Sequence, residues 1–177
     1  MFAISEISGK KLVVAVGTDH GGFSVKPEIQ KLLVSLGHQV RDCGPFVQDP
    51  GDDYSDFGAD AARMVARRQA DAAVLICRSG VGMGIVANRF NGVRAVVAQD
   101  AATARKSREH NASNVLVLPG DKIDFAAMEE IVKAWLDTPF SGDSLRVPFG
   151  RIRGAQASPR QYREIGQRVA RAILSRW

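Results

Sequence analysis

Long hydrophobic runs are missing from this chain of 177 residues. The apolar stretch from Ala72 to Cys77 is among the longest without a charge, far below the roughly 18 residues of a membrane-spanning helix. The N-terminal segment MFAISEISGKK also lacks the apolar centre of a secretory signal. We therefore expect a cytoplasmic protein that does not interact with a membrane.

Cysteine is scarce too, and the two thiols of Cys43 and Cys77 are more often free than bridged in a chain without a secretory signal. This excludes a disulfide scaffold. Apolar residues make up 45% and charged residues 24%, which excludes a disordered or collagen-like chain. The length favours one globular domain with an appended segment over two catalytic domains.

Motifs that read nucleic acids are also absent. The net charge is +5, but residues 1–145 carry 16 Lys and Arg against 18 Asp and Glu, a net −2, whereas residues 146–177 carry eight Arg and one Glu, a net +7. This C-terminal arm holds three aromatic residues and no zinc-finger, RRM or homeodomain pattern, so nucleic-acid binding is disfavoured. A small phosphorylated ligand or an acidic neighbouring subunit suits the arm better.

Five short apolar runs each precede a segment with helical spacing. The runs cover residues 11–17, 38–41, 72–77, 93–98 and 114–119. Continuous apolar runs are typical of strands buried on both faces of a parallel sheet. The sequence therefore predicts an α/β fold, a three-layer sandwich around a five-stranded parallel, Rossmann-like sheet in the order 2-1-3-4-5.

Two residues are expected to mark helix ends. Gly37 is the expected C-cap of the first helix. Ser55 is the expected N-cap of the second helix, which runs to about Gln69. Residues 1–137 are expected to form the α/β domain. Residues 138–177 are expected to form an arm and a terminal helix, from Pro159, that packs on a partner subunit.

Two polar loops follow the first and third predicted strands. Asp19-His20-Gly21-Gly22 follows the first, and CRSGVGMG, from Cys77, follows the third. Ligands of an open parallel sheet bind beyond the carboxyl ends of its strands, where the strand order reverses, so these loops should face each other. Glycine amides of the second loop favour a phosphate or oxyanion cradle. The loop lacks a P-loop lysine and the acidic partner of a dinucleotide site.

Cys77 stands at the mouth of this glycine loop. Nearby amides and Arg78 are expected to lower the pKa of its thiol, although a small buried hydrophobe is the commoner use of such a cysteine. Cys43 has no such loop and is expected to be structural.

The histidines leave alternatives open. His20 and His110 are each either solvated or functional, whereas His38, at a strand start, is expected to be structural. Asp19 is expected to orient a histidine, bind a sugar hydroxyl or cap the next helix.

Six segments occur in order between residues 11 and 146: GTDHGGFSVKPEI, DCG, DDYSDFG, LICRSGVGMGIVANRFNGVRAVV, ARKSREHNASNVL and IVKAWLDTPFSG. Together they resemble the ribose-5-phosphate isomerase B and galactose-6-phosphate isomerase family of aldose–ketose isomerases. The resemblance implies an enzyme that interconverts a phosphorylated aldose and ketose, of the ribose 5-phosphate type, without a metal or other cofactor. A tetrose or hexose phosphate substrate, or a non-catalytic phosphosugar-binding role, stays open.

The resemblance also implies roles for residues of the glycine loop. Cys77 is the base that moves a proton between C1 and C2 through an enediolate. The Ser79 hydroxyl lies near the substrate oxygens, and the loop amides, including those of Gly80, Val81 and Gly82, stabilise the enediolate.

Further roles fall on residues outside that loop. His110 helps to open the sugar ring, Asp19 lies near the hydroxyls and Asn111 assists oxyanion binding. His20 and Arg146 contact the phosphate. The family's site is completed across a dimer interface, which implies a homodimer or a dimer of dimers.

The chain departs from the family pattern in three places. Arg78 replaces a common glycine and is expected to contact and restrict the substrate. The alternatives are that it points to solvent or, across the dimer, to an acidic residue. Met83 stands where some members carry a glutamate base, which favours the cysteine. Val147 and Gly150 replace a histidine and an arginine after Arg146, which alters the phosphate contacts.

Overall fold

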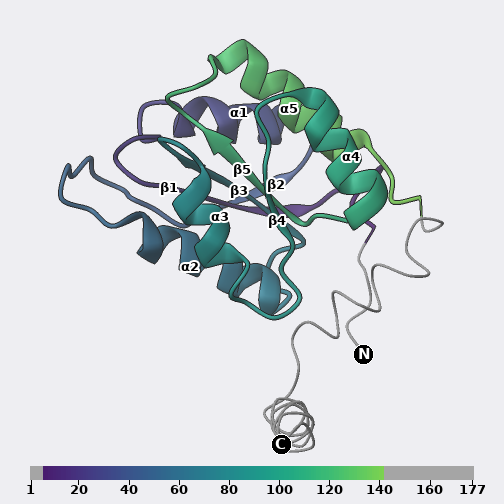
Figure 1. Ribbon diagram of the computed structural model, residues 1–177, viewed down its shortest axis with the longest axis horizontal. Coiled ribbons are helices and arrows are strands. Elements are labelled where there is room, and N and C mark those ends of the chain that lie inside the picture. The colour runs from purple at the N-terminus through teal and green to yellow at the C-terminus, as the bar shows by residue number, and fades with distance from the viewer. Residues whose placement is uncertain (1–5, 142–177) are drawn as a thin grey trace, which may run out of the picture. The chain divides into compact units, whose positions relative to one another are not determined.

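The computed structural model describes residues 6–141. Arg146, Val147, Gly150 and the helix predicted from Pro159 lie outside the described residues. Within them, strands and helices alternate along the chain (Figure 1). The elements are β1 (Val13–Thr18), α1 (Lys26–Ser35), β2 (Gln39–Asp42), α2 (Tyr54–Ala66), β3 (Ala72–Cys77), α3 (Val81–Ala87), β4 (Ala95–Val97), α4 (Ala101–Asn111), β5 (Val115–Pro119) and α5 (Phe125–Asp137).

The five strands form one parallel sheet in the order β2-β1-β3-β5-β4. The three-layer α/β prediction is confirmed, but the predicted order 2-1-3-4-5 is wrong in its last two strands. Burial explains the exchange. Every residue of β5 is buried, which suits an interior strand, whereas the three residues of β4 are only half-buried, which suits an edge. The β1–β3 contact is unaffected.

Helices α1, α4 and α5 cover one face of the sheet, and α2 and α3 cover the other (Figure 1). Alternation along the strands divides the core between these layers. Val14 and Val16 pack in the first apolar cluster, and Ala15 between them packs in the second. Among the described residues, no helix combines the length and apolar character needed to cross a membrane.

Helix ends differ in detail from the sequence prediction. The N-cap of α2 is Asp53, whose carboxylate accepts the N–H of Ser55 at 2.8 Å, so the cap predicted at Ser55 is wrong. A carboxylate is favoured there because it also meets the positive end of the helix dipole. At the other end, Arg68 takes a left-handed φ of 59°, and α2 stops before it. Gly37, with φ of 89°, follows Leu36, which is the actual C-cap of α1.

A buried ion pair joins three distant segments of the chain. The side chain of Arg108, on α4, is fully buried, and its Nη2 donates to Glu6 Oε1 at 2.9 Å. The other Glu6 oxygen accepts the N–H of Phe140, just beyond α5, at 2.9 Å. Burial alone would raise the pKa of Glu6, but backbone N–H donors and the Arg108 charge together lower it. The pair therefore holds the N-terminal segment against α4 and the end of α5.

Candidate active site

The ends of β1 and β3 bring two predicted site residues to one edge of the sheet. Thr18 pairs with Ile76 in the parallel register, so Asp19 and Cys77 stand side by side beyond the strands. The Thr18 hydroxyl also donates to the carbonyl of Ile76 at 2.7 Å. Gly22 packs tightly here, since a Cβ on it would lie 2.2 Å from Thr18 Oγ1 and 2.7 Å from Ile76 Cγ2. The loop after β1 therefore requires glycine at this position.

The thiol of Cys77 is buried and faces its own glycine loop. Its Sγ accepts the N–H of Gly80 at 3.2 Å. Burial raises the pKa of the thiol, the charge of Asp19 adds to the rise, and N–H groups of Gly80, Met83 and Ser79 oppose it. The predicted lowering of this pKa is therefore wrong, because desolvation outweighs the amides.

Arg78 supplies no compensating charge to the thiol. Its side chain is 68% exposed, and its Nε donates to Asp121 Oδ2 at 2.8 Å. Its stem lies over Gly21, where a Cβ would come within 2.3 Å of Arg78 Cγ. Backbone N–H groups of Gly120 and Asp121 donate to the carbonyls of Cys77 and Arg78, at 2.7 and 3.0 Å. The loops after β3 and β5 are thus tied together, and Arg78 has an acidic partner within its own chain.

Asp19 is almost completely buried beside the thiol. Its Oδ1 accepts the N–H groups of Gly21 and Gly22 at 2.9 and 3.2 Å. It does not cap α1, whose N-cap is Val25 without a side-chain hydrogen bond. Burial raises the pKa of Asp19, and the negative charge of Asp52 adds to the rise. A carboxyl held in this way can accept a hydrogen bond when ionised and donate one when protonated.

His20 meets a residue that sequence reasoning treated only as part of a loop. Its Nδ1 and its backbone N–H both lie within hydrogen-bond distance of Asp52 Oδ1, at 2.7 and 3.1 Å. Tyr54 was also missed, and its ring packs on Gly82 so closely that a Cβ there would lie 2.5 Å from it. The signal for both was the polar, turn-rich segment that leads into α2, where DD is followed by Tyr54, the first residue of the helix.

His110 and Asn111 lie far from these groups within one chain. Both are at the C-terminal end of α4, shortly before the start of β5. A helix that connects two parallel strands runs antiparallel to them. The C-terminal end of α4 therefore lies at the edge of the sheet where the strands begin. At about 3.3 Å per residue, the strands separate that edge from the Cys77 edge by about 15 Å. The structure therefore does not bring His110 and Asn111 to Cys77 of the same chain.

Residues 14–148 match the Ribose/Galactose Isomerase family. The chain belongs to this family. It is 39% identical to ribose-5-phosphate isomerase B of Escherichia coli over 73% of this chain and 86% of that protein. It is 32% identical to 4-deoxy-4-sulfo-D-erythrose isomerase of Clostridium sp. MSTE9 over 72% and 80%. The crystal structure of ribose-5-phosphate isomerase B from Mycoplasma genitalium with bound ribulose 5-phosphate matches with a TM-score of 0.78 and 31% identity, covering 82% of this chain and 97% of that one.

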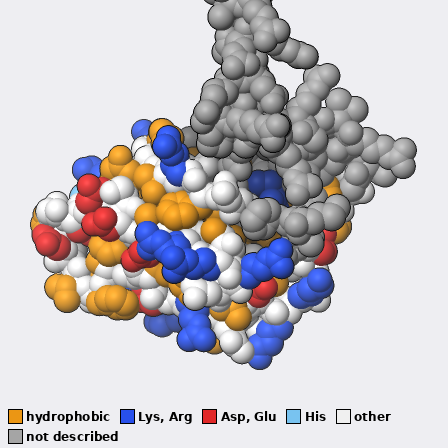
Figure 2. Space-filling model, turned by 90° about the horizontal axis from the view of Figure 1, so that it is seen from below, with side chains coloured by type: hydrophobic (Ala, Val, Ile, Leu, Met, Phe, Trp, Pro, Cys, Tyr) orange, Lys and Arg blue, Asp and Glu red, His pale blue; other side chains and the backbone are white. Residues whose placement is uncertain are grey.

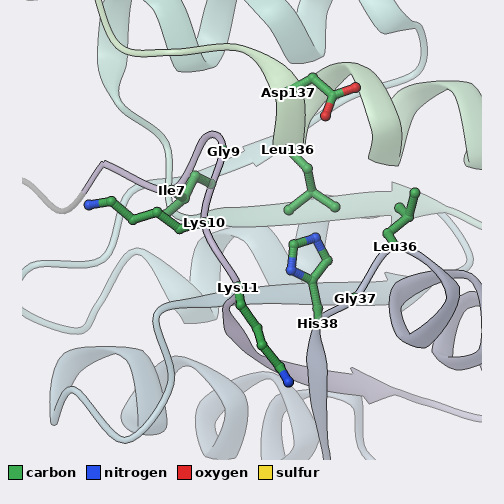
Figure 3. A pocket seen from close by; sticks show the side chains of 9 residues that line it. All are labelled: Ile7, Gly9, Lys10, Lys11, Leu36, Gly37, His38, Leu136 and Asp137. Carbon is green, nitrogen blue, oxygen red and sulfur yellow. The ribbon is translucent and has the colours of Figure 1, made fainter.

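The third histidine of this isomerase-family chain, His38, lies at the edge of the sheet opposite Cys77, where the strands begin. His38 lines a cavity of about 320 Å³ with Lys10, Lys11 and Asp137, and its ring points into the cavity toward Leu136 (Figure 3). Its Nδ1 accepts the N–H of Leu12 at 3.3 Å, and burial lowers its pKa. The hydrogen bond gives His38 a structural role.

Neither a metal site nor a second reactive thiol is found in the described part of the chain. No group of three or more His, Cys, Asp or Glu side chains there is placed to hold a metal ion. Burial, with the charges of Asp60 and Asp42, raises the pKa of Cys43 to about 11, and its sulfur lies 3.6 Å from that of Met64. With so high a pKa, Cys43 is almost wholly a neutral thiol near pH 7, and its packing on Met64 gives it a structural role.

Proposed function

We propose that the chain is a sugar-phosphate isomerase in which Cys77 moves a proton between C1 and C2 of the open-chain substrate. The observation that carries this proposal is the buried thiol at the end of β3, beside Asp19 and the amides of the glycine loop. A proton next to a carbonyl needs a positioned base and hydrogen-bond donors for the oxygen that becomes negative. This edge of the sheet offers both.

The raised pKa of Cys77 fits a proton shuttle. The thiolate takes the proton from C2 of the aldose, and the electrons of that C–H bond move into the carbonyl to form an enediolate. Loop amides, including that of Ser79, stabilise the negative oxygen on C1. The hydroxyl proton of O2 then passes to that oxygen, and the thiol returns its proton to C1, which leaves the carbonyl on C2 and gives the ketose. Burial makes the thiolate a stronger base but lowers its fraction near neutral pH, and the rate of proton removal follows the product of the two. The reaction needs no oxidant or reductant.

The substrate we propose first is ribose 5-phosphate, interconverted with ribulose 5-phosphate in the cytoplasm. Two observations keep other phosphosugars as the second candidate. One relative is named for a sulfonated tetrose derivative, and Arg78 closes over Gly21 at the mouth of the site. A bulky side chain there leaves less room beyond the reacting carbons, which favours a short sugar.

We further propose that the working unit is a homodimer or a dimer of dimers, with each site sharing residues of two copies. His110 and Asn111 reach Cys77 only from a second copy, because the sheet separates them within one chain. A surface for that copy is available on α3, where Val81 and Ile85 are 56% and 63% exposed, next to the edge strand β4. Figure 2, seen from the side of α2 and α3, shows apolar side chains among Lys and Arg on this face.

A panel of phosphorylated tetroses, pentoses and hexoses, followed by NMR in D₂O, tests the reaction. We expect interconversion of one aldose–ketose pair, with deuterium entering at C2. Binding of a phosphosugar without interconversion or exchange would instead identify a non-catalytic binding protein.

Mixing two inactive variants tests the shared site. Cys77→Ala and His110→Ala copies, dissociated together and reassembled, form mixed dimers with one intact site, so about a quarter of the wild-type activity should return after random exchange. Each variant reassembled alone is the control. No recovery in dimers shown to be mixed would place Cys77 and His110 in separate functions.

A further inference from the structure

The contact between His20 and Asp52 joins two loops that lie 32 residues apart in sequence. Asp52 Oδ1 lies 2.7 Å from His20 Nδ1 and 3.1 Å from the backbone nitrogen of the same residue. A carboxylate only accepts hydrogen bonds, so Nδ1 carries a hydrogen and Nε2 is the ring atom left for a ligand. Two contacts from one oxygen hold both the backbone and the ring of His20.

Burying the carboxylate of Asp52 costs free energy. Its side chain is 8% exposed, and its second oxygen, Oδ2, is buried without a hydrogen-bond partner in the described part of the chain. A buried carboxylate that only stabilises a fold normally has both oxygens paired, because desolvation outweighs a single contact. Its charge also acts against the buried Asp19 nearby. The fold by itself gains little from an acidic side chain here.

We propose that Asp52 is a positioning residue that holds the ring of His20 with Nε2 directed at the anionic group of the sugar phosphate. This inference rests on the proposed function and on the phosphate contact that the family resemblance implies for His20. An oriented imidazole loses less freedom when the ligand binds, and a carboxylate behind a histidine is a common means of fixing its tautomer and direction. Asp52 thus acts through His20 on substrate binding.

Steady-state kinetics separate this role from a structural one. Asp52→Val removes both the charge and the acceptor, and it should raise KM for the phosphosugar by about tenfold, with a much smaller effect on kcat. Asp52→Asn keeps an acceptor oxygen and should recover part of this loss. The midpoint of thermal unfolding should stay unchanged or rise in both variants. Asp49→Asn, an exposed acid of the same loop, is the matched control for lost charge and should leave KM unchanged.

A double variant shows whether Asp52 acts through the histidine. In a His20→Gln background, Asp52→Val should raise KM no further. The inference would be overturned if the two substitutions raised KM independently in the double variant. It would also be overturned if Asp52→Val lowered the unfolding midpoint and left KM unchanged, because Asp52 would then be a structural residue.

The ring itself gives a readout that needs no activity. Long-range ¹H–¹⁵N spectra resolve the three histidines, and His20→Gln identifies the signals of His20. We expect hydrogen on Nδ1 in the wild type and a shift toward the Nε2–H tautomer in Asp52→Val. A wild-type ring without hydrogen on Nδ1 refutes the positioning role. A wild type that turns over no phosphosugar refutes the proposed function instead, and the spectra still decide the contact.

Discussion

Replacing Cys77 with serine tests the proton shuttle most directly. Serine keeps an acceptor atom for the Gly80 N–H, which lies 3.2 Å from the sulfur, and it nearly preserves the volume of the buried side chain. Its hydroxyl is a far weaker acid than a thiol, so no base forms near neutral pH. Loss of a general base typically costs about 10²–10⁴-fold in rate, so we expect kcat to fall by at least this range, about 3–5 kcal/mol of barrier.

The assay combines isomerisation with the exchange of deuterium at C2, followed by NMR. Circular dichroism and thermal unfolding should show an intact fold, and Cys43→Ala, which removes the thiol outside the site, should retain wild-type exchange. In the wild type, kcat should rise with pH toward the thiol pKa, because burial raises that pKa and only the thiolate accepts the proton. Exchange at the wild-type rate in Cys77→Ser would refute the assignment of the base.

Two further outcomes follow from contacts around the site and the core. Arg78→Gly removes the side chain over Gly21, and kcat/KM for a pentose phosphate should rise relative to that for a tetrose phosphate. An unchanged ratio across the substrate panel would show that Arg78 does not restrict the sugar. Glu6→Gln removes the charge that balances the buried guanidinium of α4 and should lower the free energy of unfolding in urea by about 3 kcal/mol. Glu129→Gln, which breaks an exposed pair on α5, should lower it by at most about 0.5 kcal/mol. Because the pKa of Glu6 is lowered, its contribution to the free energy of unfolding should be present at neutral pH and disappear as the pH falls through that lowered pKa. An equal effect of both substitutions on that free energy would contradict the role of the buried pair.

The fold was accessible from the sequence because burial on both faces leaves a visible mark on each strand. Continuous apolar runs identified the five strands, and the rule for strand ends placed Asp19 and Cys77 together. The exchange of β4 and β5 was less visible, because AVV and VLVLP differ in burial only after the helices have packed. Relative burial, rather than chain order, decides which strand takes the edge.

The missed features of the site depend on contacts between distant loops. The thiol pKa of Cys77 depends on how far the sulfur is buried and on the charge of Asp19, which follows a different strand. Asp52 matters only because its loop folds back on His20. The spacing of residues along a short stretch of sequence does not predict such contacts, because they form only when loops at one edge of a sheet meet.

The burial of Cys77 also bears on how this protein withstands oxidants. Peroxides attack thiolates. Cys77 is a residue only 5% exposed, with a thiol pKa above its usual value, so it offers little thiolate and little access. Cys43, the other thiol, also resists ionisation, because its pKa is raised to about 11. A base made strong by desolvation is therefore also one that resists conversion to sulfenic acid, and the catalyst should outlast oxidative exposure that inactivates enzymes with acidic, open cysteines.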